Sequence, residues 1–153
     1  MDIALSVIDL NEQKLHYAGA NNPLYLIRQK SQGPLKNESE ALEPNMEDGD
    51  LSLYEIKADK QPIGSFDDRK SFTNHVLEMK KGDAVFLFSD GFADQFGGPK
   101  GKKFKYRQLD ELLLQISALP MDEQRLVLEK KFLEWKGDLE QVDDVCVVGV
   151  RRG

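Results

Sequence analysis

The stretch that most constrains this chain is residues 85–96, which read VFLFSDGFADQF. It opens with four consecutive apolar side chains, which is typical of a strand buried on both faces. The apolar run breaks at Ser89, Asp90 and Gly91, and Asp94 follows shortly after the break. Asp-Gly is a strong turn signal, and a carboxylate at the mouth of a buried strand is also well placed to hold a metal ion. Both interpretations stay open at this point.

The length and composition indicate one soluble globular domain. A chain of 153 residues can bury about two-thirds of its unfolded surface. It contains no apolar run near the roughly 20 residues of a membrane helix, and no signal peptide is visible, so we expect a cytoplasmic protein without direct membrane contact. The single cysteine excludes an internal disulfide and a cysteine-based zinc site. The net charge of −6 argues against nonspecific nucleic-acid binding and fits either metal-collecting carboxylates or plain solubility.

The first half of the chain reads as short strands joined by turns. Because the turns are tight, the first three strands should form an antiparallel meander. Strands are expected at residues 2–10, 15–20, 24–28, 51–58 and 71–79. The polar, acidic residues 29–50 are expected to form a long mobile excursion from the sheet.

The second half predicts two helices. Leu109, Leu112, Leu113 and Ile116 recur at helical spacing, and a second helix should run from about Asp122 to a stop near Gly137.

Residues 97–103, before these helices, form a basic glycine-rich loop without a complete phosphate-loop pattern. This loop is either a flexible connector or a basic flap that meets a phosphorylated substrate.

A second apolar strand bearing carboxylates is expected at residues 142–150. Asp143 and Asp144 stand at its beginning, and Cys146 should be an inert buried side chain within it. If this strand lies antiparallel to the strand ending at Asp90, four carboxylates including Asp94 should converge at one rim of the sheet. Such a cluster would suit Mg²⁺ or Mn²⁺, or the acids could simply cap surface turns. The only two histidines have no partner at ligand spacing and are expected to be structural or surface residues.

Four motifs occur in the order found in one protein family. They are AGANNPLY at residues 18–25, DKQPIG at 59–64, FLFSDGFAD at 86–94 and QVDDV at 141–145. The chain resembles the metal-dependent serine/threonine phosphatases of the stage II sporulation protein E type, bacterial relatives of type 2C phosphatases. The resemblance extends over residues 2–151. It implies an α+β fold in which antiparallel β-sheets pack as a sandwich flanked by helices.

The resemblance also implies a two-metal site with Mn²⁺ or Mg²⁺ in the cleft between the sheets. Asp90, followed by Gly91, matches the metal-ligating Asp-Gly element, and Asp143 matches the ligand in the last strand. Asp144 falls at an outer position of the site, and Asp94 matches an acid near an additional metal in some members. The metals would activate a bridging water, so no covalent enzyme intermediate is needed.

The family's opening motif, Asp-x-x-Gly-His-Gly, does not occur in this sequence. Residues 1–153 are therefore expected to be the C-terminal part of a single phosphatase domain with an incomplete metal site. We expect weak metal binding, little phosphatase activity, and an open sheet edge or exposed apolar face that favours a homodimer.

Three functions stay open from the sequence. The first is a serine/threonine protein phosphatase, a phosphoric monoester hydrolase that serves as the output domain of a bacterial signalling protein. The resemblance suggests a phosphorylated anti-anti-sigma-type regulator as its substrate. The second is a non-catalytic module that binds a phosphoprotein or another partner. The third is a structural fragment whose acids only cap turns.

Overall fold

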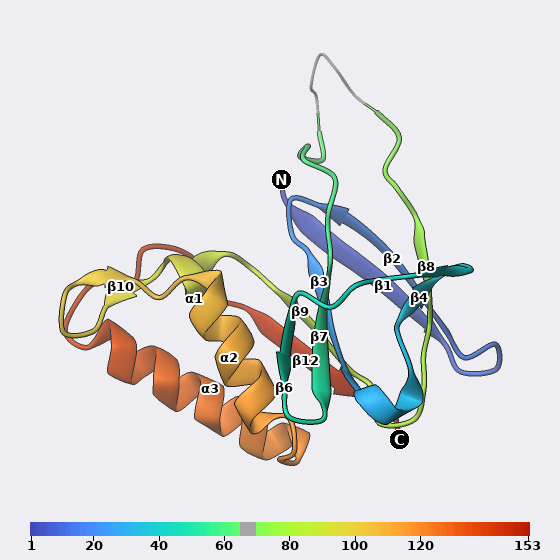
Figure 1. Ribbon diagram of the computed structural model, residues 1–153. Helices are drawn as coiled ribbons and strands as arrows, with labels where there is room; N and C mark the ends of the chain where they lie inside the picture. Colours follow the sequence, from blue (N-terminus) through green and yellow to red (C-terminus); the bar gives the residue numbers. More distant parts are fainter. Residues whose placement is uncertain (65–69) are drawn as a thin grey trace.

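The computed structural model describes residues 1–64 and 70–153 of the chain. Two five-stranded antiparallel sheets pack together, and helices cover one of them (Figure 1). The outer sheet has the order β1 (Ile3–Asp9), β2 (Lys14–Ala20), β8 (His75–Glu78), β4 (Lys36–Asn37) and β5 (Glu40–Ala41). The central sheet has the order β12 (Val147–Arg151), β9 (Ala84–Phe88), β3 (Leu24–Gln29), β7 (Leu51–Ile56) and β6 (Met46–Asp48). The expected α+β sandwich is confirmed.

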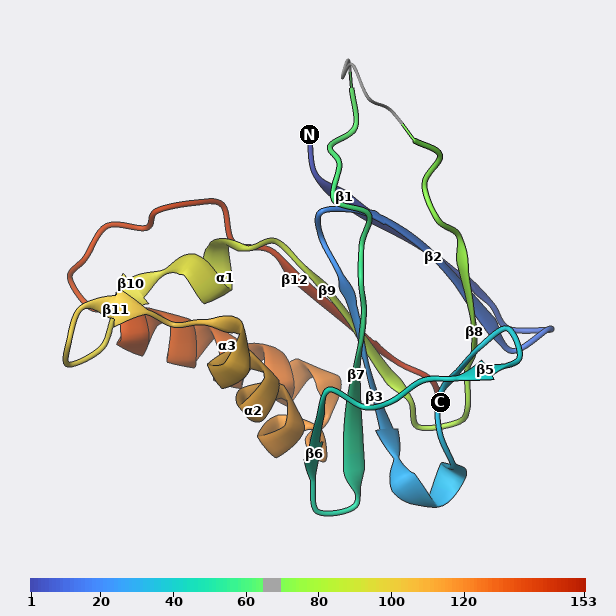
Figure 2. The ribbon, with the colours of Figure 1, turned by 45° about the horizontal axis from the view of Figure 1, so that its top comes forward.

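The remaining elements lie beside or between these sheets. They are the 3₁₀ turn η1 (Lys30–Gln32), the single helical turn α1 (Gly91–Asp94), the hairpin of β10 (Phe96–Gly97) and β11 (Lys102–Lys103), α2 (Tyr106–Ile116) and α3 (Met121–Lys136). Helices α2 and α3 lie on the face of the central sheet that points away from the outer sheet (Figure 2). None of the helices in the described ranges is both long enough and apolar enough to cross a membrane.

The central sheet is apolar on both faces because each face borders a separate core. In β3, Leu24 and Leu26 belong to the core between the two sheets, whereas Tyr25 and Ile27 belong to the core under the helices. In β9, Phe86 and Phe88 likewise belong to the core under the helices, whereas Val85 belongs to the core between the sheets. This arrangement explains the continuous apolar runs, since successive side chains of a strand point to opposite faces.

The helices cover the central sheet through the apolar stripe expected from the sequence. Leu109, Leu112, Leu113 and Ile116 of α2 are all buried in the core under the helices. Leu128 and Phe132 of α3 join the same core. Burial of each such side chain contributes about 1.5–3 kcal/mol, so this face holds the helices on the sheet.

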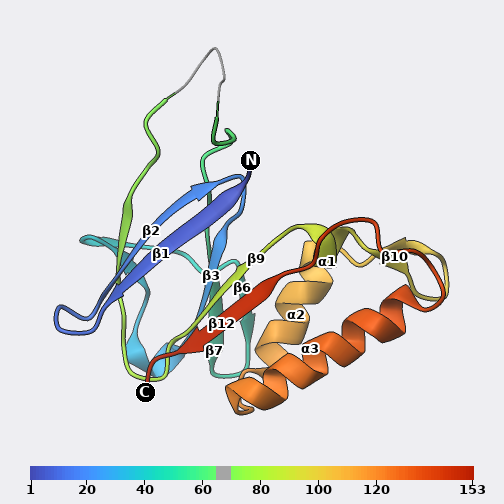
Figure 3. The same cartoon turned by 180° about the vertical axis from the view of Figure 1, so that it is seen from behind.

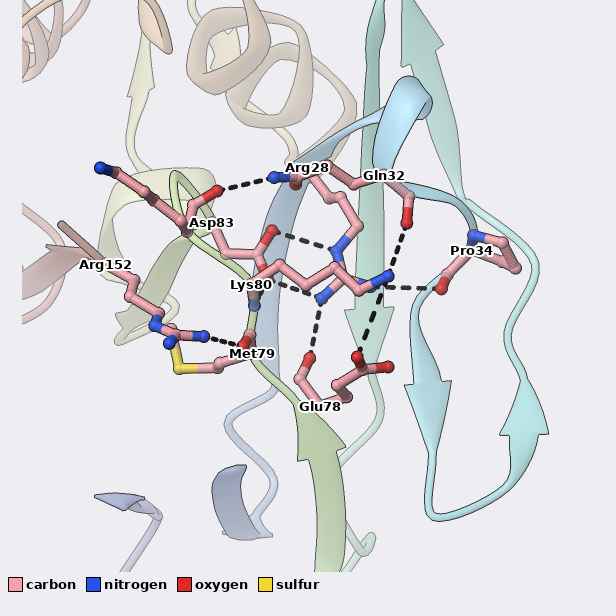
Figure 4. A network of polar contacts seen from close by, with 9 residues as sticks. Arg28, Gln32, Pro34, Glu78, Met79, Lys80, Asp83 and Arg152 are labelled. Atoms are coloured by element: carbon pink, nitrogen blue, oxygen red, sulfur yellow. Dashed lines mark hydrogen bonds and ion pairs between the residues drawn. The ribbon is translucent and has the colours of Figure 1, made fainter. Parts of the chain in front are cut away.

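A buried ion pair links β3 to the turn that leads into β9, and its arginine also reaches β8 of the outer sheet (Figure 4). Arg28 on β3 donates from Nε and Nη2 to the two carboxylate oxygens of Asp83, at 3.0 and 2.6 Å, and both side chains are fully buried. Arg28 also donates to the carbonyls of Pro34 and Glu78, and the backbone N–H of Lys80 donates to Asp83. Nearly every polar atom of the pair is therefore satisfied, as a buried pair requires.

Three sequence expectations are wrong in detail. Residues 29–50 are not a mobile excursion, because Leu35 is fully buried between the sheets and Met46 on β6 pairs with Leu53 on β7. The last strand begins at Val147, several residues later than expected. Cys146 precedes that strand and is exposed, so it is not a buried side chain.

The outer sheet turns an apolar face away from both cores. Ile3, Leu5 and Val7 alternate along the edge strand β1 and are 37%, 60% and 57% exposed. Seen from behind, β1 and β2 have no helix across them, whereas α2 and α3 lie beside the central sheet (Figure 3). An edge strand with an apolar face favours association between copies of the chain. The expected homodimer is consistent with this face and stays a prediction.

Candidate metal centre

The pairing of β9 with β12 brings the two acidic motifs to one end of the central sheet. The strands are antiparallel, with Phe88 opposite Val147, so the exit of β9 lies beside the entrance of β12 as expected. Ser89 extends this pairing: its N–H donates to the Cys146 carbonyl, and its hydroxyl accepts from the Cys146 N–H. The same hydroxyl donates to the Asp144 carbonyl at 2.8 Å. Ser89 thereby fixes the segment before β12 against the Asp-Gly turn.

Gly91 allows a very close approach of the same two segments. A Cβ atom at Gly91 would lie 2.4 Å from the carbonyl oxygen of Asp144, a distance that real Cβ atoms do not show. Gly91 begins the helical turn α1, and Asp90 occupies the position before it. The backbone of Gly91, next to Asp90, therefore lies against the backbone of Asp144, and this contact requires glycine at position 91.

The four carboxylates have different surroundings. Asp143 accepts a hydrogen bond from the N–H of Asp144 at 2.7 Å, which fixes its side chain along its own backbone. Asp94 forms an ion pair with Lys103, with 3.0 Å between the carboxylate oxygen and Nζ. The Asp90 side chain is exposed and does not cap α1. Asp144 is exposed as well, and neither Asp90 nor Asp144 forms a side-chain hydrogen bond or ion pair with a residue in the described ranges. Both carboxylates are thus free to take an external ligand.

The carboxylates do not converge as closely as the sequence suggested. No group of three or more His, Cys, Asp or Glu side chains within residues 1–64 and 70–153 is arranged to hold a metal ion. Carboxylate oxygens are the donors that Mg²⁺ and Mn²⁺ prefer, and Mg²⁺ often takes only one or two from the protein. The donor chemistry of Asp90 and Asp143 fits such an ion, but the described residues do not make the expected two-metal site. Asp90, Gly91, Asp94, Asp143 and Asp144 as metal residues all stay predictions.

Gln95 positions the acidic segment, a role that no sequence pattern indicates. Its side chain is fully buried, donates to the Glu140 carbonyl at 2.9 Å and accepts from the N–H of Val142 at 3.3 Å. Its backbone carbonyl accepts from the indole N–H of Trp135 at 3.0 Å. Gln95 therefore ties the end of α1 to the chain that leads into Asp143. A single buried glutamine between Asp94 and Phe96 belongs to no sequence pattern that would reveal this role.

A second group of ionisable side chains lies beside the centre, at the start of α2. Burial, followed by the negative charges of Asp90 and Asp94, raises the pKa of Tyr106 above its usual value. Burial also raises the pKa of Asp110 to about 6, against a lowering by the hydrogen bond from Tyr25. Tyr106 thus shares the electrostatic environment of Asp90, which sequence analysis had missed.

Comparison with solved structures places this arrangement among the type 2C phosphatase folds. The chain is similar to the SiaA-PP2C domain of Pseudomonas aeruginosa, with 25% identity and a TM-score of 0.77 over 99% of this chain and 52% of that chain. It is also similar in fold to the Mn-presoaked SpoIIE phosphatase domain of Bacillus subtilis, with 19% identity and a TM-score of 0.60 over 99% of this chain and 56% of that chain. The chain therefore spans about half the length of these solved relatives.

The family comparison is more specific than the fold. The stage II sporulation protein E (SpoIIE) family matches residues 1–153, and the chain belongs to that family. A comparison with curated proteins found no match. Family and fold together support a phosphatase-type function.

Proposed function

We propose that this chain is part of a metal-dependent serine/threonine protein phosphatase, with Asp90 and Asp143 as metal ligands. The observation that carries the proposal is the antiparallel pairing of β9 and β12, which brings the Asp-Gly turn and the Asp143 segment to one end of the sheet. Membership of the SpoIIE family supports it. Mn²⁺ or Mg²⁺ would be the metal, and a phosphorylated anti-anti-sigma-type regulator the substrate.

Each residue has a separate task in this proposal. A bound metal supplies a water of lowered pKa for attack on the phosphoester. Asp90 presents a carboxylate that no residue in the described ranges engages, whereas the Asp144 N–H holds the Asp143 carboxylate in one orientation. Gly91 lets the two segments touch. The Ser89 hydroxyl is engaged with Asp144 and Cys146, which suits a structural residue better than a nucleophile.

The proposed catalyst is incomplete in the part of the chain that the structure describes, because no third metal-binding side chain joins the centre there. We propose that the missing ligands come from a polypeptide equivalent to the rest of the solved relatives. An apolar groove of about 830 Å³ between α3 and β12 would receive it. Phe86, Leu128 and Val147 line this groove, and β12 is an open edge of the central sheet.

The test is release of inorganic phosphate from a phosphoserine peptide with and without Mn²⁺. We expect slow Mn²⁺-dependent release, reduced to background in Asp90→Asn and Asp143→Asn. The matched control is Asp48→Asn, an exposed acid on β6, which should behave as the unmodified chain does. Equal release from all four proteins would contradict the proposed roles. Rapid release that Asp90→Asn abolishes would instead show that the site is complete.

A second function, a non-catalytic module that binds a phosphoprotein, is favoured by the absence of a three-ligand group among the described residues. It predicts that the chain binds the phosphopeptide without releasing phosphate at any Mn²⁺ concentration.

A further inference from the structure

A basic hairpin projects beside the candidate metal centre. We define it as residues 96–105, which contain β10, β11 and four exposed lysines but no acidic residue. The lysines are Lys100, Lys102, Lys103 and Lys105. Their concentration contrasts with the net charge of −6 of the whole chain.

The hairpin is anchored to α3 and is not a loose connector. A Cβ atom at Gly97 would lie 1.7 Å from the carbonyl oxygen of Trp135, and the Gly98 N–H donates to that oxygen at 2.8 Å. Phe104 packs edge-on against the Trp135 ring, with 5.2 Å between centroids, and its N–H donates to Gln95. These contacts favour the interpretation of residues 97–103 as a basic flap over that of a flexible connector. They anchor the hairpin at both ends, and a backbone held in place lowers the entropic cost of binding.

The backbone conformation of Lys105 is a second unusual feature of the hairpin. Lys105 has φ 74° and ψ 149°, a conformation that residues other than glycine rarely adopt. Its N–H donates to the Ala93 carbonyl of α1 at 2.7 Å, which holds this conformation. Glycine would adopt this φ without backbone strain. The residue at this position is instead a lysine, which adds a positive charge to the hairpin.

The hairpin meets the candidate centre through Asp94. Lys103 forms an ion pair with Asp94, whose N–H donates to the Asp90 carbonyl at 2.9 Å across the single turn of α1. The basic surface thus begins one helical turn, about 5.4 Å along a helix axis, from the proposed ligand. Lys100, Lys102 and Lys105 form no ion pair with any residue in the described ranges. These ammonium groups are available to a partner.

We propose that the basic hairpin binds an acidic segment of the phosphorylated protein whose phosphoserine enters the centre at Asp90 and Asp143. This inference rests on the proposed function and adds the substrate class. An acidic partner is repelled by most of this chain, but charges beyond about 10 Å are screened at 0.1 M salt. Distant acids therefore contribute little to the encounter, and Lys100, Lys102 and Lys105 attract the acidic segment locally, beside Asp90.

The test measures binding of two fluorescein-labelled phosphoserine peptides of equal length by fluorescence anisotropy. Three glutamates flank the phosphoserine on each side in one peptide, and glutamines replace them in the other. We expect the acidic peptide to bind about tenfold more tightly at low salt, the order expected for a few exposed ion pairs. The preference should fade at high salt.

The Lys100→Glu/Lys102→Glu variant should lose this preference. A matched control, Lys36→Glu/Lys81→Glu, makes the same change in net charge at exposed lysines of β4 and the turn before β9, and should keep most of it. Circular dichroism would confirm that both variants fold. Equal affinities for the two peptides, no measurable binding of the acidic peptide, or equal losses in both variants would overturn the inference. Phosphate release is measured separately, so failure of catalysis with the lysine-dependent preference intact counts only against the proposed function.

Discussion

Replacing Asp83 with alanine is expected to lower the free energy of unfolding by about 3–5 kcal/mol, because it leaves Arg28 as a buried charge without a partner. Both side chains have no exposed area, and Asp83 accepts from two guanidinium nitrogens. Alanine also removes the acceptor of the Lys80 N–H. Urea unfolding followed by the fluorescence of Trp135, the single tryptophan, would measure the loss.

Two controls separate charge burial from packing. The double variant Arg28→Met/Asp83→Leu removes both charges, and we expect it to be more stable than Asp83→Ala. Glu129→Ala breaks the exposed Arg125–Glu129 pair on α3 and should cost less than about 1 kcal/mol. A loss for Asp83→Ala as small as that for Glu129→Ala would contradict the buried network.

The variant Gly91→Ala is expected to separate the Asp-Gly turn from the segment before β12. The added methyl group would lie 2.4 Å from the Asp144 carbonyl, so the two backbones must move apart. Overpacking of this kind costs about 1–3 kcal/mol. The backbone of Gly91 is helical, and alanine suits a helix better than glycine does. Any loss of stability therefore comes from crowding.

The measurement is urea unfolding together with amide chemical shifts of Asp144, Val145 and Cys146. Gly33→Ala is a useful contrast, because Gly33 has φ 78° and no neighbour within 4 Å of a Cβ atom. It should lose stability through backbone strain and leave those amide shifts unchanged. Gly91→Ala with unchanged stability and unchanged shifts would show that the two segments do not touch.

The sequence predicted the sheet better than the contacts that join its parts. The apolar residues of β3 and β9 follow from burial on both faces. The antiparallel pairing of β9 with β12 entered the sequence analysis only as a condition, and the structure shows it. The Asp-Gly break indicates either a turn or a metal-binding position, and the sequence did not predict that residues 91–94 form a single helical turn in which Phe92 and Ala93 are buried. Local patterns do not carry that tertiary information.

Polar contacts between residues far apart in the chain were the main feature that the sequence did not predict. Arg28 and Asp83 are 55 positions apart, and each looked like an ordinary charge at the end of a strand. Gln95 and Val142 are 47 positions apart, and their contact depends on how α3 returns the chain to the sheet. Such pairs are set by packing, so a single sequence shows neither partner. Packing also sets where the four acids near the ends of β9 and β12 point. Their positions in the sequence therefore did not predict whether their carboxylates would converge.

The most direct test of the central claim is titration of the chain with Mn²⁺, with free Mn²⁺ measured by electron paramagnetic resonance. We predict weak binding, with a dissociation constant on the order of millimolar, because few protein ligands meet at this centre within the described ranges. Asp90→Asn and Asp143→Asn should each abolish this binding, whereas Asp48→Asn should retain it. Mn²⁺ binding that is the same in Asp90→Asn as in the unmodified chain would contradict a metal centre at the end of β9 and β12.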